Sequence, residues 1–251
     1  MDELRDRIDR CAVAAWTART LALGGDIVRT DGLVTFLTGL PMAPLNPTLV
    51  ERQPADPAAA VAGAEAAYRD RAVAFGIALD PARRSTTRAA VEGRGLRLLE
   101  HRPVMALAAD ELLPVGAPEG VRIVRGEPHL DRVARVDAAA FGGDVAVNRR
   151  FLGAAVGEPD ARIYVAFVAG EAVACAEAFL GDGVLGVFGV ATIPEARRRG
   201  IASAVTAFVV EDHAGRFDLA TLDASELGHG VYRRLGFRDV GASEVWIRSP
   251  A

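Results

Sequence analysis

The chain of 251 residues contains no lysine, so its 29 basic side chains other than histidine are all arginines. It therefore cannot form a Schiff base or a Walker A phosphate loop, because both need a lysine amine. Only two cysteines are present, Cys11 and Cys175, and each lies among apolar residues. No histidine is close to Cys175 in the sequence, so we interpret both as buried small side chains rather than nucleophiles.

The sequence also lacks long apolar runs and an excess of positive charge. No run approaches the roughly 20 apolar residues of a membrane-spanning helix. The charged start Met1–Arg7 has no secretory apolar core. The net charge of −4 argues against a nucleic-acid partner, which usually needs a basic face. We expect a cytoplasmic protein without a nucleic-acid or membrane partner, in which the 51% hydrophobic residues form a packed core.

A strand, a turn and a helix follow one another within Val184–Ala204. The apolar strand ends near Thr192, the following Ile-Pro pair forces a turn, and three arginines lead into Gly200, where a helix begins. The first N–H groups of a helix have no partner within the helix, and the helix dipole adds positive charge there. With arginines beside it, such an end is suited to hold phosphate. The competing interpretation is a tight connection whose arginines only face water.

Proline and glycine cluster between residues 109 and 120, which predicts a linker between two halves. We expect an N-terminal α/β domain at residues 1–112, a linker at 113–120 and a C-terminal domain at 121–251. Periodicity in the C-terminal half predicts a strand, two helices, three strands, a helix, a strand, a helix and a strand. The expected ranges are 121–125, 129–141, 148–156, 162–169, 172–180, 184–192, 200–214, 218–222, 226–235 and 245–247.

The segment Arg197–Ala202 resembles the motif Arg/Gln-x-x-Gly-x-Gly/Ala of the GCN5-related N-acetyltransferases, the GNAT superfamily. The element order of residues 121–249 is also similar to that of this family, including Tyr232 and the Gly-Phe pair after the last helix. The resemblance implies an α/β (α+β) GNAT fold, with a mixed, mostly antiparallel sheet flanked by helices.

The N-terminal half has a similar rhythm of elements without the phosphate-binding motif. We expect helices at residues 2–22, 54–71 and 81–92, a hairpin at 27–40 and strands at 72–79 and 96–107. This half resembles the degenerate first domain of a tandem GNAT protein. The polar face of its first helix mixes acidic and basic residues, which favours a core-packing helix over a membrane-surface helix.

The resemblance implies that acetyl-CoA is a co-substrate. In the family, the end of the strand runs alongside the pantetheine arm, and the amides of the following turn hold the pyrophosphate. Gly200 lacks a Cβ, so phosphate can approach the backbone there. The expected cofactor-binding residues are Val190, Ala191, Thr192, Arg197, Arg198, Arg199, Gly200, Ile201, Ala202, Ser203 and Ser225.

Two residues are expected to carry the chemistry. The resemblance implies that Tyr232 is the general acid for the leaving thiolate; the alternative is a tyrosine that only packs a short helix. Glu177 stands in an apolar strand and is our candidate for the base or a substrate contact. Alternatively, Glu177 faces outward or pairs with an arginine, Asp223 is the base, or water relays the proton.

Three other patterns are interpreted as structural. Gly181–Gly186 matches a dinucleotide motif formally but precedes a strand instead of opening a helix. We expect Glu211–His213 to lie on the solvated end of a helix. The histidines lack metal-ligand spacing, so no metal is expected; they are His101, His129, His213 and His229.

Together these patterns predict an N-acetyltransferase that passes an acetyl group directly from acetyl-CoA to a primary amine. An acyl-CoA-binding sensor or regulatory module is the alternative, and a structural protein that binds a partner is a third possibility. The sequence does not identify the acceptor, the acyl chain or the oligomeric state, because fold alone does not specify function.

Overall fold

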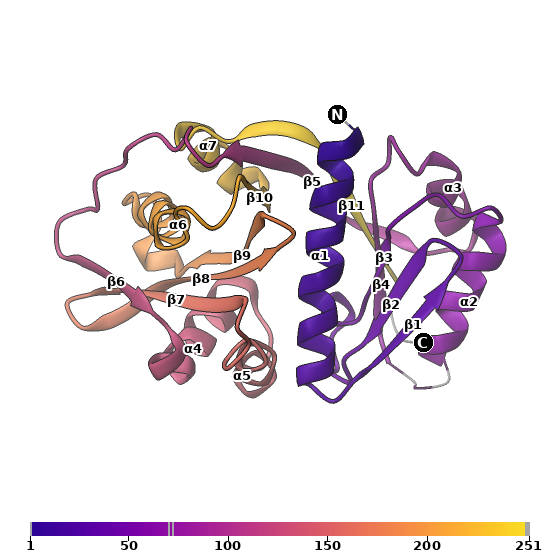
Figure 1. The fold of residues 1–251 in the computed structure, drawn as a ribbon. Coiled ribbons are helices and arrows are strands. Elements are labelled where there is room, and N and C mark those ends of the chain that lie inside the picture. Colours follow the sequence, from indigo (N-terminus) through magenta and orange to yellow (C-terminus); the bar gives the residue numbers. More distant parts are fainter. Residues whose placement is uncertain (1, 70, 72, 249–251) are drawn as a thin grey trace. The chain divides into compact units, whose positions relative to one another are not determined.

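The computed structural model describes residues 2–69, 71 and 73–248, which form two compact units (Figure 1). Unit 1 lies within residues 1–104 and 240–251, and unit 2 is residues 105–239. In the described part of the chain, no helix is both long and apolar enough to cross a membrane.

Unit 1 begins with a long helix and continues with a hairpin and a strand–helix–strand–helix–strand segment. Its elements are α1 (Asp2–Ala22), β1 (Asp26–Thr30), β2 (Leu33–Leu37), the 3-10 turn η1 (Ala43–Leu45), β3 (Pro47–Val50), α2 (Pro57–Arg69), β4 (Phe75–Leu79), α3 (Ser85–Gly93) and the first part of β5 (Arg97–Ala108). The strand order in this unit is β1-β2-β3-β4-β11, with β3 and β4 parallel and the other neighbours antiparallel.

Alternation along β2 explains why all five of its residues are buried. Val34 and Phe36 pack in a cluster with Val13 of α1, whereas Leu33 and Leu37 pack in a cluster with Tyr68 of α2. The two helices therefore cover opposite faces of this sheet, as Figure 1 shows. A strand buried on both faces needs apolar residues at successive positions.

Unit 2 contains the remaining elements. These are β6 (Val121–Arg125), the 3-10 turn η2 (Glu127–His129), α4 (Leu130–Phe141), α5 (Val145–Gly153), β7 (Ala161–Val168), β8 (Glu171–Gly181), β9 (Val184–Thr192), the 3-10 turn η3 (Pro194–Ala196), α6 (Ile201–Asp212), β10 (Leu219–Asp223) and α7 (Glu226–Arg234). The strand order is β5-β10-β9-β8-β7-β6. Helices α6 and α4 contact opposite faces of β7–β9 (Figure 1).

The compact units are divided differently from the domains expected at residues 1–112 and 121–251. Strand β5 begins in unit 1 and ends in unit 2 with residues 105–108, and β11 (Arg238–Arg248) passes in the opposite direction at residue 240. β11 pairs with β4 in unit 1, from Glu244↔Leu79 to Arg248↔Phe75, and β5 lies beside β10 in unit 2. In each unit, the strand beside the parallel pair therefore comes from the other half of the sequence: β11 in unit 1 and β5 in unit 2. The proline- and glycine-rich segment 109–120 has no helix or strand and belongs to unit 2.

The two halves of the sequence share an internal repeat. In the N-terminal half the order β3–α2–β4–α3–β5 matches β9–α6–β10–α7–β11 of the C-terminal half, and the first two strands of each series are parallel. The mixed α/β architecture with mostly antiparallel strands agrees with the expected fold class, and the repeat is the arrangement expected of a tandem protein.

Two local expectations need correction. The helix expected at residues 148–156 starts earlier, at Val145, because the Asp144 side chain caps it by accepting hydrogen bonds from the Ala146 and Val147 amides. The end of α6 is not simply solvated: His213 is only 1% exposed. Asp212 accepts hydrogen bonds from the Tyr164 hydroxyl at 2.8 Å and from the Arg125 guanidinium at 3.1 Å, so this end is held against β6 and β7.

Candidate active site

The parallel strands of unit 2 part before β9 ends. Their ladder joins Val184, Leu185 and Gly186 to Leu219, Ala220 and Thr221. Within the described residues, β9 then continues to Thr192 without a ladder partner on β10. The backbone of residues 187–192 is thus available on that side for an extended ligand to add as a strand would. This stretch includes the predicted Val190, Ala191 and Thr192.

A β-bulge distorts β9 in the middle of this open stretch. On the β8 side, Cys175 pairs with Ala191 and Glu177 with Phe188, so one residue of β8 opposes two of β9. Gly189 occupies the bulge with a φ of +54°, in the left-handed region that favours glycine. A Cβ at Gly189 would lie 3.1 Å from Oε1 of Glu177. The bulge therefore brings the carboxylate of Glu177 against the β9 backbone.

Glu177 is only 5% exposed and does not stand alone. Burial raises the pKa of the Cys175 thiol well above its usual value, and the negative charges of Asp137 and Glu177 raise it further. The charges of both carboxylates thus act on this sulfur, and Cys175 is a poor nucleophile, as expected. Asn148 donates from Nδ2 to Oδ2 of Asp137 at 2.7 Å and so orients this carboxylate. The sequence did not reveal Asp137, because its helix position carries no motif.

The turn from β9 into α6 exposes backbone N–H groups. Arg198 and Gly200 have φ values of +60° and +78°, and residues 197–200 are exposed. The first hydrogen bond of the helix type runs from the Ala204 amide to the Gly200 carbonyl. No side chain caps the helix and its first turn has no acidic residue. The amides of residues 201–203 therefore precede the first intrahelical bond at the positive end of the dipole.

The three arginines of this turn differ in their contacts. Arg197 donates from Nε to the Thr192 carbonyl at 3.1 Å, which ties the turn to the end of β9. Arg198 adopts a conformation that disfavours residues with a Cβ, and such strain is common at functional sites. Arg199 is exposed directly before Gly200. Of the predicted phosphate-binding residues, only Ile201 and Ser203 have buried side chains.

Tyr232 lies on α7, packed inside the unit with 7% of its surface exposed. Gly228, one turn earlier, makes room for the ring, since a Cβ there would lie 2.9 Å from Cε2 of Tyr232. The Phe237 ring meets it edge-on at 6.1 Å between centroids. Burial raises the pKa of Tyr232 to about 12. The phenol therefore keeps its proton over the whole neutral range.

Ser225 has a clear structural task. It is the N-cap of α7, and its Oγ accepts a hydrogen bond from the Gly228 amide at 3.1 Å. Its side chain is exposed at the end of β10, so the hydroxyl proton is still available to a ligand. The alternative base Asp223 is the last residue of β10 and is also exposed.

In the described residues, no group of three or more His, Cys, Asp or Glu side chains is arranged to hold a metal ion.

Residues 159–239 match the family model described as "Acetyltransferase (GNAT) domain". Unit 2 carries a GNAT domain. The match includes β9, the arginine turn, α6 and α7, which are the elements that position the predicted site residues. No curated protein sequence matches the chain.

Solved structures resemble the whole chain in fold. A GCN5-related N-acetyltransferase from Kribbella flavida is 20% identical with a TM-score of 0.74, over 95% of both chains. A conserved protein of unknown function from Staphylococcus epidermidis is 13% identical with a TM-score of 0.69, over 91% of this chain and 96% of the other. A tandem GNAT protein from the clavulanic acid biosynthesis pathway is 16% identical with a TM-score of 0.59, over 90% and 82%. The likeness in fold to these structures thus includes the N-terminal half of the chain.

Proposed function

We propose that the protein is an N-acetyltransferase that passes an acetyl group from acetyl-CoA directly to a primary amine. The observation that carries the proposal is the combination of an open β9 edge with an uncapped α6 N-terminus directly after it. The first feature suits an extended pantetheine arm and the second suits a pyrophosphate. A cytoplasmic location remains part of the proposal.

Backbone amides would do most of the binding. In this proposal the amides of Arg198, Arg199, Gly200, Ile201, Ala202 and Ser203 hold the pyrophosphate. The arginine side chains add charge at the mouth of the site. Val190, Ala191 and Thr192 line the pantetheine arm. An amide near Val190 would face the oxyanion of the tetrahedral intermediate, a contact typically worth about 3 kcal/mol.

Tyr232 is the proposed general acid. Its pKa of about 12 keeps it protonated, so it can donate a hydrogen bond to the leaving sulfur. Complete proton transfer from Tyr232 to a thiolate, whose usual pKa is about 8.5, is unfavourable by roughly three pKa units. A proton from solvent would therefore complete the step, and the Ser225 hydroxyl would contact the cofactor from the neighbouring cap.

Glu177 and Asp137 are the proposed contacts for the acceptor amine. Two carboxylates whose charges both act on the Cys175 sulfur would attract a protonated amine. One of them or an intervening water must take its proton before attack. This assignment favours a cationic acceptor. Asn148 would hold Asp137 in place for it.

The test is acetyl-CoA binding by calorimetry, followed by CoA release across a panel of primary amines. The proposal predicts binding and amine-dependent release. In Tyr232→Phe, turnover should fall at least ten-fold while acetyl-CoA affinity changes less than two-fold. Binding without release for any amine would support an acyl-CoA sensor instead. No binding would contradict both.

A further inference from the structure

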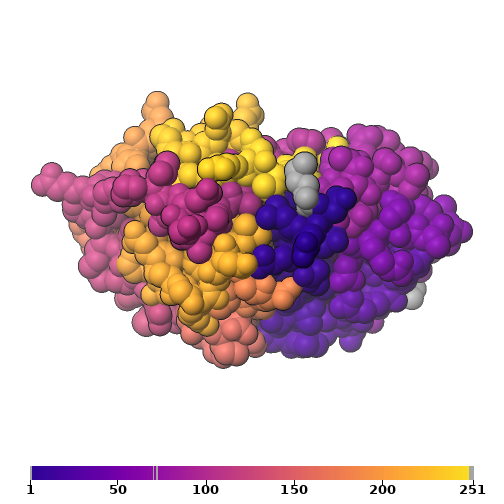
Figure 2. Space-filling view, turned by 45° about the horizontal axis from the view of Figure 1, so that its top comes forward, coloured from indigo at the N-terminus to yellow at the C-terminus, as the bar shows by residue number. Residues whose placement is uncertain are grey.

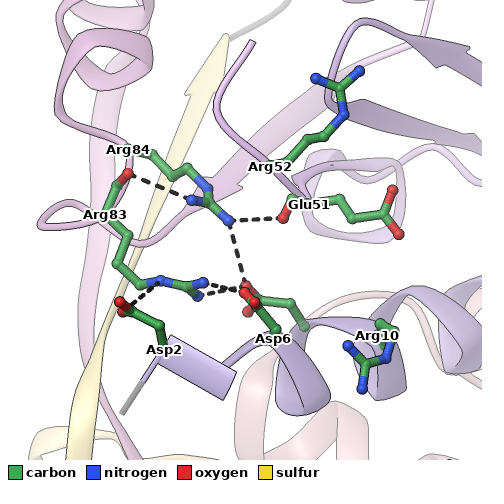
Figure 3. A pocket seen from close by; sticks show the side chains of 8 residues that line it. Asp2, Asp6, Arg10, Glu51, Arg52, Arg83 and Arg84 are labelled. Atoms are coloured by element: carbon green, nitrogen blue, oxygen red, sulfur yellow. Dashed lines mark hydrogen bonds and ion pairs between the residues drawn. The ribbon is translucent and has the colours of Figure 1, made fainter. Parts of the chain in front are cut away.

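A charged cleft of about 610 Å³ lies in unit 1 (Figure 3). Helix α1 forms one wall, and the segments that follow β3 and precede α3 form the other. The cleft is thus at the carboxyl ends of the parallel strands β3 and β4, where open α/β sheets commonly bind ligands. Its volume is within the usual range for small-molecule sites. The first turn of α1, shown in indigo, is at the surface in the space-filling view (Figure 2).

Arg83 in this cleft is already neutralised by α1. Its Nη1 lies 2.9 Å from Oδ2 of Asp9, its Nη2 pairs with Asp6, and its Nε is 3.8 Å from Oδ1 of Asp2. The three aspartates lie at helical spacing on one face of α1. Because these three carboxylates compensate its positive charge, Arg83 does not require a further anion from a ligand.

Arg84 is in a different situation, at only 8% exposed. Its Nη2 donates to the Glu51 main-chain carbonyl at 2.7 Å (Figure 3). Its nearest carboxylate, Asp9, is 3.8 Å away and already bound by Arg83. Its Nε is buried and, among the described residues, has no hydrogen-bond partner. Burial lowers the pKa of Arg84, and the positive charge of Arg83 lowers it further. Nη1 also donates to the Arg83 main-chain carbonyl at 3.5 Å, so within the described part of the chain Nε is the one position of this guanidinium without an acceptor. A buried N–H of a charged group that lacks an acceptor is suited to bind an anionic group.

The acidic lining limits what kind of anion fits. Four acidic side chains balance four arginines around the cleft. A ligand with several negative charges would be repelled by the acids, and one with several positive charges by the arginines. The Glu51 carboxylate, opposite α1, pairs with Arg29 at 3.4 Å on an exposed surface, where an ion pair contributes little and a ligand ammonium group can join it. A small molecule with one charge of each sign matches this lining.

We propose that the cleft binds a small zwitterion of the α-amino acid class, with its carboxylate on Arg84 and its ammonium group at Glu51. All lining residues belong to unit 1, so the proposal is independent of acyl transfer in unit 2.

The first test is calorimetry of the full chain with each of the standard amino acids and with inorganic phosphate. An amino acid that binds is then compared with its N-acetyl and amide derivatives, each of which lacks one charge. We expect at least one amino acid to bind, both derivatives to bind at least ten-fold more weakly, and phosphate not to bind. The proposal is overturned if no amino acid binds, if a derivative binds equally well, or if phosphate binds more tightly.

Variants locate the site. Arg84→Gln should weaken amino-acid binding at least ten-fold. Because Arg84 is buried, a second variant tests the site without disturbing the packed interior: Glu51→Gln changes a half-exposed side chain, with the same expected loss. Arg69→Gln, at an exposed position on α2, is the control and should change nothing. Unchanged affinity in Glu51→Gln would overturn the assignment of the ammonium group.

Discussion

The two units contain the same strand–turn–helix connection, but they fill its anion site in different ways. In unit 2 the turn into α6 has glycine at the N-cap, no acidic residue in the first turn and three arginines beside it. In unit 1 two aspartates accept hydrogen bonds from amides at the corresponding start of α2. Asp31, from the turn between β1 and β2, accepts one from the Ala55 amide, and Asp56 accepts one from the Ala59 amide at 3.0 Å.

This difference is the reason why we propose a ligand site at α6 and a purely structural connection at α2. A helix N-terminus favours negative charge whatever its source. In α2 the chain supplies that charge, and Pro57 at the first helical position removes one N–H donor altogether. In α6 the charge is left for a ligand to supply. We infer that one acetyl-CoA site exists per chain, although the fold repeats.

The largest effect is expected when α6 is given an internal anion like that of α2. Ala202→Glu should reduce acetyl-CoA affinity at least 100-fold, because its carboxylate competes with the pyrophosphate. Folding should not suffer, since glutamate near a helix N-terminus is favourable. Calorimetry and thermal unfolding measure the two effects. Ala202→Gln is the matched uncharged control, and equal losses in both variants would mean that size rather than charge blocks the site.

The next largest effect is expected from replacing Arg198, whose backbone has a positive φ. Arg198→Gly should lower acetyl-CoA affinity about ten-fold, the usual loss for one charge-assisted contact to phosphate. The melting temperature should stay the same or rise, because glycine relieves a positive φ of +60° that costs other residues about 1–2 kcal/mol. A lower melting temperature together with unchanged affinity would show that Arg198 has a structural role instead.

The sequence was most informative where structure is decided locally. The end of β9, the turn and Gly200 were predicted because each signal lies within a few residues of the next. The position of β5 beside β10 and that of β11 beside β4 were not predicted, because strands that pair can lie far apart in the sequence. The Asp31 contact spans 24 residues and depends on the hairpin fold. The bulge at Gly189 and the approach of Asp137 to Cys175 likewise depend on tertiary packing.

A moderate effect is expected when unit 1 loses its internal anion. Asp56→Ala should lower the free energy of unfolding by about 1 kcal/mol, the usual cost of removing an N-cap side chain. Acetyl-CoA affinity should not change, because α2 belongs to the other unit. Urea unfolding and calorimetry measure both quantities. A loss of cofactor affinity would contradict the assignment of the site to α6.

The smallest effect is a dependence of stability on pH. The hydrogen bond from the Ala55 amide, with help from Arg52, lowers the pKa of Asp31 below its usual value near 4. This carboxylate therefore stabilises the fold fully above that value, and the stabilisation is lost as pH falls through the lowered pKa. In urea unfolding between pH 2 and 6, Asp31→Asn should lose less stability on acidification than the unchanged chain. Parallel curves would show that Asp31 contributes nothing to α2.

Of the N-termini of α2 and α6, we expect only that of α6 to receive a ligand phosphate. Calorimetric titration of the full chain with acetyl-CoA tests this directly through the stoichiometry. We expect one acetyl-CoA per chain, and no measurable binding in Ala202→Glu. Two molecules per chain, or one that persists in Ala202→Glu, would contradict it.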